Sequence, residues 1–356
     1  MRVTLEDVCE KGSSNLKQSD VINKTGAYPI YGAAGYLGNV DFYHQDKPYV
    51  AVVKDGAGIG RTTLHPAKSS VIGTMQYLLP KNNVLPEYLY YVVQYMHLEK
   101  YFTGATIPHI YFKDYKAEQF NLDAIERQKE IVASLQKVET LIKARQQQLQ
   151  KLDELIKARF VELFGDCKSM VSMNELCSII TDGTHQPPRF QESGIPFIFV
   201  SNLVGNVVTY NAEKFISEDT YAELYKRTPI EIGDLLLSTV GSYGHPAVVT
   251  EDRKFLFQRH IAYLKPRHNM VNSFYLHSAL LAPDGQRQIE EKVKGIAQKT
   301  LNLSEIKKIV VPLPTIEEQN QFEQFVNRVD KSKVAVQKSL DEAQLLFDSL
   351  MQQYFG

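Results

Sequence analysis

A polar loop at residues 181–189 carries side chains suited to recognising another molecule by hydrogen bonding. It consists of Thr181-Asp182-Gly183-Thr184-His185-Gln186-Pro187-Pro188-Arg189. Its arginine, glutamine and histidine could contact base edges or phosphate groups. The alternative is a surface turn in which the aspartate caps its own backbone. The loop is therefore a candidate binding site whose function the motif alone does not decide.

A second candidate surface is aromatic. Four tyrosines with interleaved glycines lie near the N-terminus, and they are Tyr28, Tyr31, Tyr36 and Tyr43. Such a set could form an adaptable recognition surface. The alternative is that these rings are ordinary core and turn aromatics.

The glycine-rich segment Gly56-Ala57-Gly58-Ile59-Gly60 follows an expected strand, as a phosphate-binding loop does. Thr62, Thr63 and Pro66 break the helix that such a loop requires, and no acid follows within about twenty residues to hold a ribose. We therefore predict a tight strand-to-strand turn here. The segment Gly241-Ser242-Tyr243-Gly244 is expected to form its counterpart.

No set of residues in the sequence indicates catalysis. The chain lacks the Asn/Asp-Pro-Pro-Tyr/Phe tetrad of amino methyltransferases, a Gly-x-x-x-x-Gly-Lys-Ser/Thr loop and any metal-binding histidine spacing. No catalytic residue and no metal ligand is predicted. Cys9, Cys167 and Cys177 have no CxxC spacing, which favours buried core thiols in a reduced cytoplasm.

The charge of the chain does not indicate a ligand class. The 356 residues carry a formal net charge of -1, so binding to nucleic acid would need charges arranged by face or supplied by partners. No apolar run is long enough to span a membrane, and no signal segment is recognised. We expect a cytoplasmic protein.

The two halves of the chain repeat each other. Val3-Thr4-Leu5-Glu6-Asp7-Val8-Cys9 returns as Val171-Ser172-Met173-Asn174-Glu175-Leu176-Cys177. In the later part of each half the offset is a constant 191 residues, which places Ile110 on Leu301 and Gln128 on Gln319. A duplicated unit predicts internal pseudo-two-fold symmetry, and hence a partner or ligand met in two related ways.

Each half ends in a long helix with apolar residues spaced alternately by four and three, which is the pattern of a coiled coil. The first seam consists of Ile131, Leu135, Val138, Ile142, Leu149, Leu152 and Ile156, with Arg145 and Arg159 also on it and Leu163 at its end. The second consists of Phe322, Val326, Val329, Val336, Leu340, Phe347 and Leu350, with Lys333, Ala343 and Tyr354 also on it. The two-fold relation predicts that the helices pair antiparallel, with the charged seam residues setting their register. The alternative is that each helix packs on its own domain.

These patterns predict an α+β protein of two mixed domains joined by two long helices that form an antiparallel coiled coil. Strands are expected at Tyr49–Val53 and Asp234–Ser238, and short helices at Tyr88–Met96, opened by Pro86, and at Asn272–Leu281. The predicted segments are two recognition domains, each followed by its helix, at residues 1–120, 121–165, 166–315 and 316–356.

The whole chain resembles the specificity subunit of Type I restriction–modification enzymes. In the second half the resemblance is carried by Asp182-Gly183-Thr184-His185, Gly194–Ile198, Gly233–Ser238, Leu301-Asn302, Val311–Pro314 and Glu317–Gln319. In the first half it is carried by Gly26–Ala33, Asp55-Gly56 and Ile125–Gln128. The first half lacks the Asp-Gly-Thr-His loop and the Pro-Leu-Pro before its helix, which suggests that the two domains read different sequences.

The resemblance implies a non-catalytic subunit in which each target-recognition domain reads one half of a bipartite site in double-stranded DNA. It also implies that the coiled coil sets the spacer between the half-sites and docks two modification subunits. Those subunits would hold S-adenosylmethionine and methylate adenine, and restriction subunits with ATP and magnesium would add cleavage. No cofactor is expected in this chain.

Candidate DNA contacts are polar or aromatic residues in expected exposed loops at or beside these motifs. In the first domain they are Lys17, Tyr36, Lys54 and Arg61. In the second they are Thr184, His185, Arg189, Asn202, Tyr243, His245 and Lys299. The competing hypothesis is an adaptor with two modules on a coiled coil that binds protein or glycan, and the near-neutral charge is compatible with it.

Overall fold

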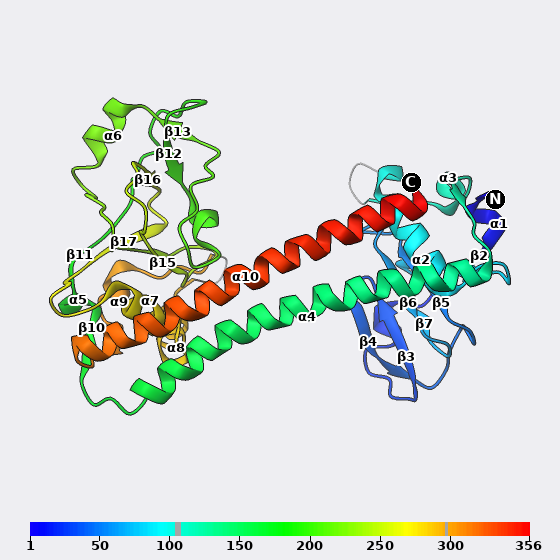
Figure 1. Ribbon diagram of the computed structural model, residues 1–356, viewed down its shortest axis with the longest axis horizontal. Coiled ribbons are helices and arrows are strands. Elements are labelled where there is room, and N and C mark those ends of the chain that lie inside the picture. Colours follow the sequence, from blue (N-terminus) through cyan, green and yellow to red (C-terminus); the bar gives the residue numbers. More distant parts are fainter. Residues whose placement is uncertain (104–107, 296–297) are drawn as a thin grey trace. The chain divides into compact units, whose positions relative to one another are not determined.

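The structure is a computed structural model that describes residues 1–103, 108–295 and 298–356, and its contacts divide the chain into two compact units (Figure 1). Unit 1 comprises Met1–Gln146 and Gln337–Gly356, and unit 2 comprises Gln147–Val336. Both long helices, α4 (Ile125–Phe164) and α10 (Ile316–Phe355), contribute to both units. The division therefore runs through the helices. The four segment boundaries expected from the sequence stay a prediction.

Unit 1 contains two sheets and a two-stranded ladder. Strands β2, β8, β5 and β6 form an antiparallel sheet in that order, β3 pairs antiparallel with β4 and parallel with β7, and β1 pairs with β9. The strands are β1 Arg2–Thr4, β2 Cys9–Ser13, β3 Tyr28–Gly32, β4 Gly35–Val40, β5 Tyr49–Val53, β6 Thr62–His65, β7 Ser70–Val71, β8 Met75–Pro80 and β9 Gln119–Asn121. The short helices are α1 Leu5–Val8, α2 Pro86–Tyr95 and α3 Phe112–Tyr115, with 3₁₀ turns η1 Gln18–Asp20 and η2 Leu98–Tyr101.

Unit 2 has the same topology. Strands β11, β17, β14 and β15 form the antiparallel sheet, β12 pairs antiparallel with β13 and parallel with β16, and β10 pairs with β18. The strands are β10 Met170–Ser172, β11 Cys177–Asp182, β12 Ile195–Ile198, β13 Phe215–Ile216, β14 Leu235–Ser238, β15 Pro246–Val248, β16 Leu256–Phe257, β17 Ile261–Pro266 and β18 Val310–Pro312. The helices are α5 Met173–Leu176, α6 Glu218–Leu224, α7 Ser273–Leu281, α8 Pro283–Lys292 and α9 Leu303–Ile306, with η3 Val200–Leu203. The predicted internal repeat is thus confirmed strand by strand.

The predicted strands and short helices form as their sequences indicate. Strand β5 is buried along its whole length, as a run of Val and Tyr between two neighbouring strands should be. Helix α2 opens at Pro86, whose missing N–H costs nothing in a first turn. Gly56, Gly58 and Gly60 have positive φ and join the antiparallel strands β5 and β6. The prediction of a strand-to-strand turn instead of a phosphate loop is confirmed.

The heptad positions form the packed face of the two long helices. Apart from Leu163, the predicted apolar seam residues from Ile131 to Leu350 are buried or half-buried, whereas Leu155 and Leu345, off the seam, are exposed. Leu163 was expected on the seam but is 45% exposed. Near this end of α4 the helix instead buries Phe160 and Phe164, because a straight helix drifts away from a strict seven-residue repeat.

The helices run antiparallel within each unit. In unit 1 the Arg127 guanidinium lies 5.9 Å from the Tyr354 ring centroid, and Arg145 Nε donates to Ser339 Oγ at 3.1 Å. Residue numbers therefore increase along α4 while those of the contacting residues on α10 decrease. In unit 2 the same order relates Asp153 to Lys333, at 2.6 Å, and the Phe160 ring to the Phe322 ring, at 5.5 Å between centroids. The prediction of antiparallel pairing is confirmed in both units.

Two of the three cysteines are core residues. Cys9 and Cys177 occupy equivalent buried positions, and burial raises the pKa of each thiol to about 12. Both thiols are therefore protonated and unreactive at neutral pH. Cys167 is only half-buried, so the prediction of core thiols is wrong for this residue.

Candidate nucleic-acid interface

Asp182, at the end of β11 in unit 2, connects the 181–189 loop to the segment after α6. Its Oδ2 lies 2.8 Å from Nε2 of His185, and its Oδ1 accepts a hydrogen bond from Nη2 of Arg227 at 2.8 Å. The Asp182 side chain is 18% exposed, whereas His185 and Arg227 are each about half exposed. The carboxylate therefore holds the two half-exposed side chains of His185 and Arg227 in place. These contacts are to other side chains, unlike those of a turn in which the aspartate caps its own backbone.

The backbone of this loop is held against the turn before β17. The N–H of Thr184 donates to the Phe257 carbonyl at 3.0 Å, and the N–H of Arg259 donates to the Thr184 carbonyl at 3.1 Å. A Cβ on Gly183 would lie 2.3 Å from the Phe257 carbonyl oxygen, so only glycine fits there. The loop is thus fixed by main-chain contacts rather than by its side chains alone.

Two surface hollows flank this loop. One of about 460 Å³ is lined by residues 183–189 and by Thr220, Glu223, Leu224, Arg227 and Thr228, and we call it the loop hollow. Another of about 300 Å³ is lined by Asp182, Thr239, Val240, Arg259, His260, Gln298 and Thr300–Leu303. Thr184, His185 and Arg189, predicted from the sequence, all line the loop hollow. Arginines and polar side chains thus surround both sides of the Asp182 turn.

Sequence reasoning missed Arg227, Arg259 and His260 in this region. No local motif marks them, because they reach the loop only through the packing of α6 and the turn before β17. Burial, with the charge of the neighbouring Arg259, lowers the pKa of His260. The neutral imidazole is therefore the dominant form of His260 at neutral pH.

Tyr243 and Lys299 are brought together by Glu290 of α8. Glu290 accepts hydrogen bonds from the Tyr243 hydroxyl and, at 2.9 Å, from the Lys299 ammonium, which also donates to the Tyr243 hydroxyl at 3.2 Å. These hydrogen bonds from Tyr243 and Lys299 lower the pKa of Glu290, so that it is ionised at neutral pH. Both predicted DNA contacts therefore lie at one exposed cluster, where an acid neutralises the lysine.

Two of the predicted contacts are held inside unit 2. Asn202 is only 8% exposed, its amide donates to the carbonyls of Thr209 and Asn211, and its Oδ1 accepts from the N–H of Phe199. The expectation that Asn202 lies in an exposed loop is wrong, since its amide braces the segment after β12. His245 is half-buried, and its Nδ1 lies 3.0 Å from Oδ1 of Asn206.

In unit 1, Tyr36 follows the β3–β4 turn and Arg61 contacts that turn. Tyr36 is 62% exposed with its ring 6.0 Å from that of Tyr31, and Arg61 Nη1 donates to the Ala33 carbonyl at 2.9 Å. Lys54 instead pairs with Asp55 at 3.3 Å, and that carboxylate also lies 2.6 Å from Nδ1 of His109. Tyr36 and Arg61 are thus both exposed and both belong to or contact the region of the β3–β4 turn.

The remaining first-domain candidates lie apart from that turn. Lys17 is exposed at the start of η1, where its N–H donates to the Asp20 carboxylate at 2.9 Å. Among the four tyrosines, Tyr28 and Tyr43 stack edge to face at 4.8 Å, and Tyr28 and Tyr31 are half-buried. Tyr36 is therefore the member of the set most available to a ligand.

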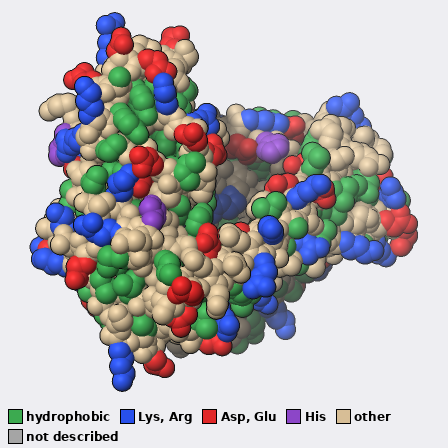
Figure 2. All heavy atoms as spheres, turned by 60° about the vertical axis from the view of Figure 1, so that its left-hand side comes forward, with side chains coloured by type: hydrophobic (Ala, Val, Ile, Leu, Met, Phe, Trp, Pro, Cys, Tyr) green, Lys and Arg blue, Asp and Glu red, His purple; other side chains and the backbone are tan. Residues whose placement is uncertain are grey.

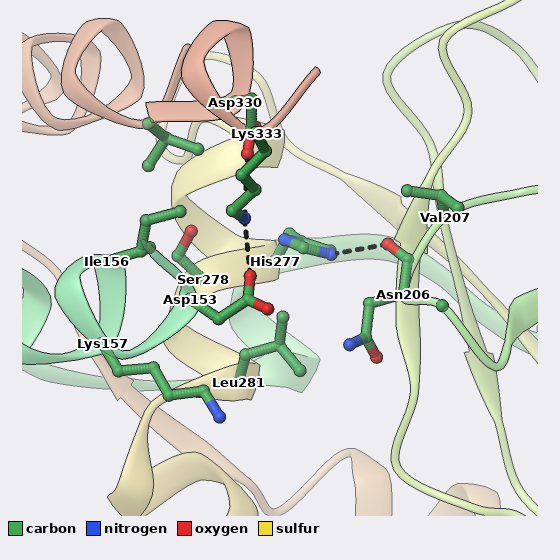
Figure 3. A pocket seen from close by; sticks show the side chains of 12 residues that line it. Asp153, Ile156, Lys157, Asn206, Val207, His277, Ser278, Leu281, Asp330 and Lys333 are labelled. Carbon is green, nitrogen blue, oxygen red and sulfur yellow. Dashed lines mark hydrogen bonds and ion pairs between the residues drawn. The ribbon is translucent and has the colours of Figure 1, made fainter. Parts of the chain in front are cut away.

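Another cavity of unit 2, of about 250 Å³, lies where α4, α7 and α10 approach the loop around Asn206 (Figure 3). Lys333 reaches into it, paired with Asp153 at 2.6 Å and with Asp330 at 3.0 Å, and Nε2 of His277 lies 3.0 Å from the Asn206 carbonyl oxygen. Partial burial alone would lower the pKa of Lys333, but its bonds to the two carboxylates outweigh burial and raise the pKa. The charged seam position thus joins the two helices, as its predicted role in register requires.

The visible surface carries mixed charge. On the face in Figure 2, Lys and Arg side chains are interspersed with Asp and Glu, without a broad area of one sign. Within the described ranges, no three His, Cys, Asp or Glu residues form a group that could hold a metal ion, and no helix is long and apolar enough to cross a membrane. On the face that Figure 2 shows, contacts to a ligand would depend on particular side chains more than on bulk charge.

Comparison with known proteins identifies the family. Residues 1–154 and 169–343 match the family described as Type I restriction modification DNA specificity domain. The chain is 30% identical over 170 residues to the Type I restriction enzyme EcoBI specificity subunit of Escherichia coli, which covers 48% of this chain and 36% of that protein. It is 20% identical over 307 residues to the Type I restriction enzyme MjaVIII specificity subunit of Methanocaldococcus jannaschii, which covers 79% and 72%. The match to the EcoBI subunit thus spans only about a third of that protein's length.

Two solved structures share the fold. One is the S subunit of a Type-I restriction-modification system from M. genitalium, with a TM-score of 0.56 and 15% identity over 100% of this chain and 96% of that chain. The other comes from a study of complex assembly and conformational transition of the type I R-M system, with a TM-score of 0.56 and 16% identity over 99% and 97%. These matches give no support to the adaptor hypothesis. Because the family match extends over both halves, the chain belongs to the Type I restriction–modification DNA specificity family.

Proposed function

We propose that this chain is the DNA-recognition subunit of a Type I restriction–modification complex, with each half reading one part of a bipartite site in double-stranded DNA. The observation that carries this proposal is the duplicated topology: the same two sheets occur in each unit, in a chain whose two halves both match the specificity family. Two similar but non-identical recognition domains suit a site of two different half-sequences separated by unread bases. The similar proteins are named as specificity subunits of Type I restriction enzymes, which is compatible with the proposal.

Each unit would read its half-site through loops in the major groove, where base edges distinguish all four base pairs. The candidates in unit 2 are Thr184, His185 and Arg189 around the loop hollow, and Tyr243 and Lys299 at the Glu290 cluster. His245 is a weaker candidate because it is half-buried against Asn206. In unit 1 the exposed pair Tyr36 and Arg61 is favoured over Lys17 and Lys54.

The paired helices would set the spacer and dock two modification subunits. Lys333 and Arg145 support the first role, since each makes a polar contact that connects α4 with α10 and so opposes sliding of one helix along the other. Exposed apolar residues on the outer faces of the helices, such as Leu155 and Leu345, are available for docking.

The proposal assigns no catalytic step to this chain. The modification subunits would hold S-adenosylmethionine and methylate adenine, and restriction subunits would use ATP and magnesium. All of these components would act in the cytoplasm. With a net charge of -1 on the chain, the modification subunits would supply much of the contact to phosphate.

Binding of a randomised duplex library tests the proposal. The full chain, in complex with its modification subunit, should select duplexes with two short fixed sequences and an unread spacer of constant length. The affinity should fall steeply with salt concentration, as binding to phosphate requires. Selection of no sequence, or of one uninterrupted sequence, would contradict the proposal.

A further inference from the structure

The loop hollow of unit 2 combines hydrogen-bond donors with acceptors. Arg189 and Arg227 line it together with the carboxylate of Glu223, and the carboxylate of Asp182 lies directly beside it against Arg227. Two arginines are thus balanced by two acids. A phosphate would be repelled by those acids, whereas a base edge presents acceptors to arginine and can present a donor to a carboxylate. The composition of the hollow therefore favours a base over the DNA backbone.

Arg227 is the arginine of this hollow whose orientation is fixed. Asp182 belongs to β11, within the four-stranded sheet, and its Oδ1 accepts the hydrogen bond from Nη2 at 2.8 Å. The same carboxylate is held from its other oxygen by His185 at 2.8 Å. About half of the Arg227 side chain remains exposed, so the rest of its planar donor group can face a ligand.

An arginine that is already oriented loses less conformational entropy when it binds. Guanine is the base whose major-groove edge offers two neighbouring acceptors, O6 and N7, that match the two-pronged guanidinium. Arg259, beside the neighbouring hollow, differs from Arg227 because its Nε faces the ring of the adjacent His260 at 3.3 Å. Among the described residues, Arg189 forms no ion pair with a carboxylate that would orient it in this way.

We propose that Arg227, oriented by the Asp182 carboxylate, reads a guanine in the half-site recognised by unit 2. Arg227 is the base-contacting residue, and Asp182 is a positioning residue that acts through it. This inference rests on the proposed function and adds to it one base and the residue that selects it.

The variants Arg227→Lys and Arg227→Ala test the contact. Lysine keeps the charge but loses the two-pronged geometry, so a phosphate contact would survive Arg227→Lys and a guanine contact would not. The full chain in complex with its modification subunit is used to select from a randomised duplex library, and the wild type supplies the reference motif. Both variants should lower the preference for guanine at one position about 5- to 150-fold, which corresponds to ~1–3 kcal/mol, and leave the other positions unchanged.

Arg253→Ala is the matched control. Arg253 is an exposed arginine of the same unit that lies over the Tyr210 ring at 4.9 Å and does not line the loop hollow. It removes the same charge and should leave the motif unchanged. An unchanged motif in Arg227→Lys, or a loss of affinity that is equal for all sequences in Arg227→Ala, would overturn the inference.

Asp182→Asn tests the positioning role with the same selection. The amide is nearly the same size but carries no charge, so Arg227 should lose its fixed orientation and the guanine preference should fall at the same position as in Arg227→Lys. A motif that Asp182→Asn leaves intact would overturn the positioning role. If the wild type itself selects no motif, the proposed function fails, and that result is distinct from the failure of this inference.

Discussion

Gln128 and Gln319 hold equivalent positions in the two halves and make the same hydrogen bonds. Each is fully buried in the first turn of a long helix. The Gln128 Oε1 accepts from the N–H of Leu85, and its Nε2 donates to the carbonyls of Asn83 and Asp123. Gln319 repeats this with Asn272, Met270 and Pro314. Each glutamine therefore fixes a long helix to the start of the short helix, α2 or α7, in its own unit.

Replacing Gln319 with leucine should destabilise unit 2. The substitution keeps the side-chain volume similar but leaves the Asn272 N–H and two carbonyls without this partner, and each buried unsatisfied group costs ~1–3 kcal/mol. Urea unfolding should show a lower midpoint for Gln319→Leu. Gln321→Leu, an exposed neighbour on the same helix, is the control and should change the midpoint little. Equal midpoints for the two variants would contradict the structural role of Gln319.

The stability of unit 1 should depend on pH through His65. Burial lowers the pKa of His65 to about 4 from an ordinary value near 6.5, with the ring stacked on Tyr49. Because the folded-state pKa is depressed, the unfolded chain binds the proton more readily. The contribution of the buried neutral His65 ring to the free energy of unfolding is therefore fully present above pH 6.5 and is lost as the pH falls towards 4.

This pH dependence can be isolated by substitution. The lost contribution amounts to at most roughly 3 kcal/mol from the size of the pKa shift. The difference in the free energy of unfolding between pH 7 and pH 5 should be smaller in His65→Phe than in the wild type. His260 and His277, whose pKa values burial also lowers, remain in both proteins and cancel in this comparison. An identical pH dependence would contradict the prediction.

Glu290 should oppose DNA binding. It engages Lys299 and Tyr243, so DNA must compete with it for the lysine. Glu290→Gln should tighten DNA binding up to about tenfold, because it removes a negative charge that repels DNA and frees the lysine to contact it. Glu291→Gln removes the same charge from the same helix, where it pairs with Arg287 at 2.7 Å instead. Equal effects of the two variants would mean that Lys299 lies outside the interface.

More of the fold than of the candidate site could be predicted from the sequence, because the sequence patterns that specify the fold are periodic and local. The heptads and the 191-residue repeat are visible in the sequence, and they predict the antiparallel helices and the shared topology of the units. The prediction was wrong at the end of the first seam, where Phe160 and Phe164 are buried in place of Leu163.

The site depends on contacts between segments distant in the chain. Asp182 and Arg227 are 45 residues apart, and neither segment alone indicates that they meet. Asn202 shows the opposite failure, since a polar residue beside a family-like motif proved to be an internal brace. Hydrogen bonds within the fold compete for the same side chains as ligands, and the sequence does not show which partner wins.

Shortening both long helices should shorten the spacer between the half-sites. Deleting residues 146–152 and 337–343 removes one heptad from each helix at equivalent positions and keeps the seam in phase. The helices lose about 10 Å, or about three base pairs of duplex. Library selection should return the same half-sites with a shorter spacer. Deleting the heptad from only one helix mismatches the pair and should abolish selection. An unchanged spacer in the double deletion would exclude the helices as the ruler.

The central claim is tested most directly by mapping methylated adenines across the DNA of a cell that expresses this chain with its modification subunit. The account predicts a single split motif with a fixed unread spacer, which disappears when this chain is omitted. No new methylation, from a modification subunit that is active beside another specificity subunit, would contradict it.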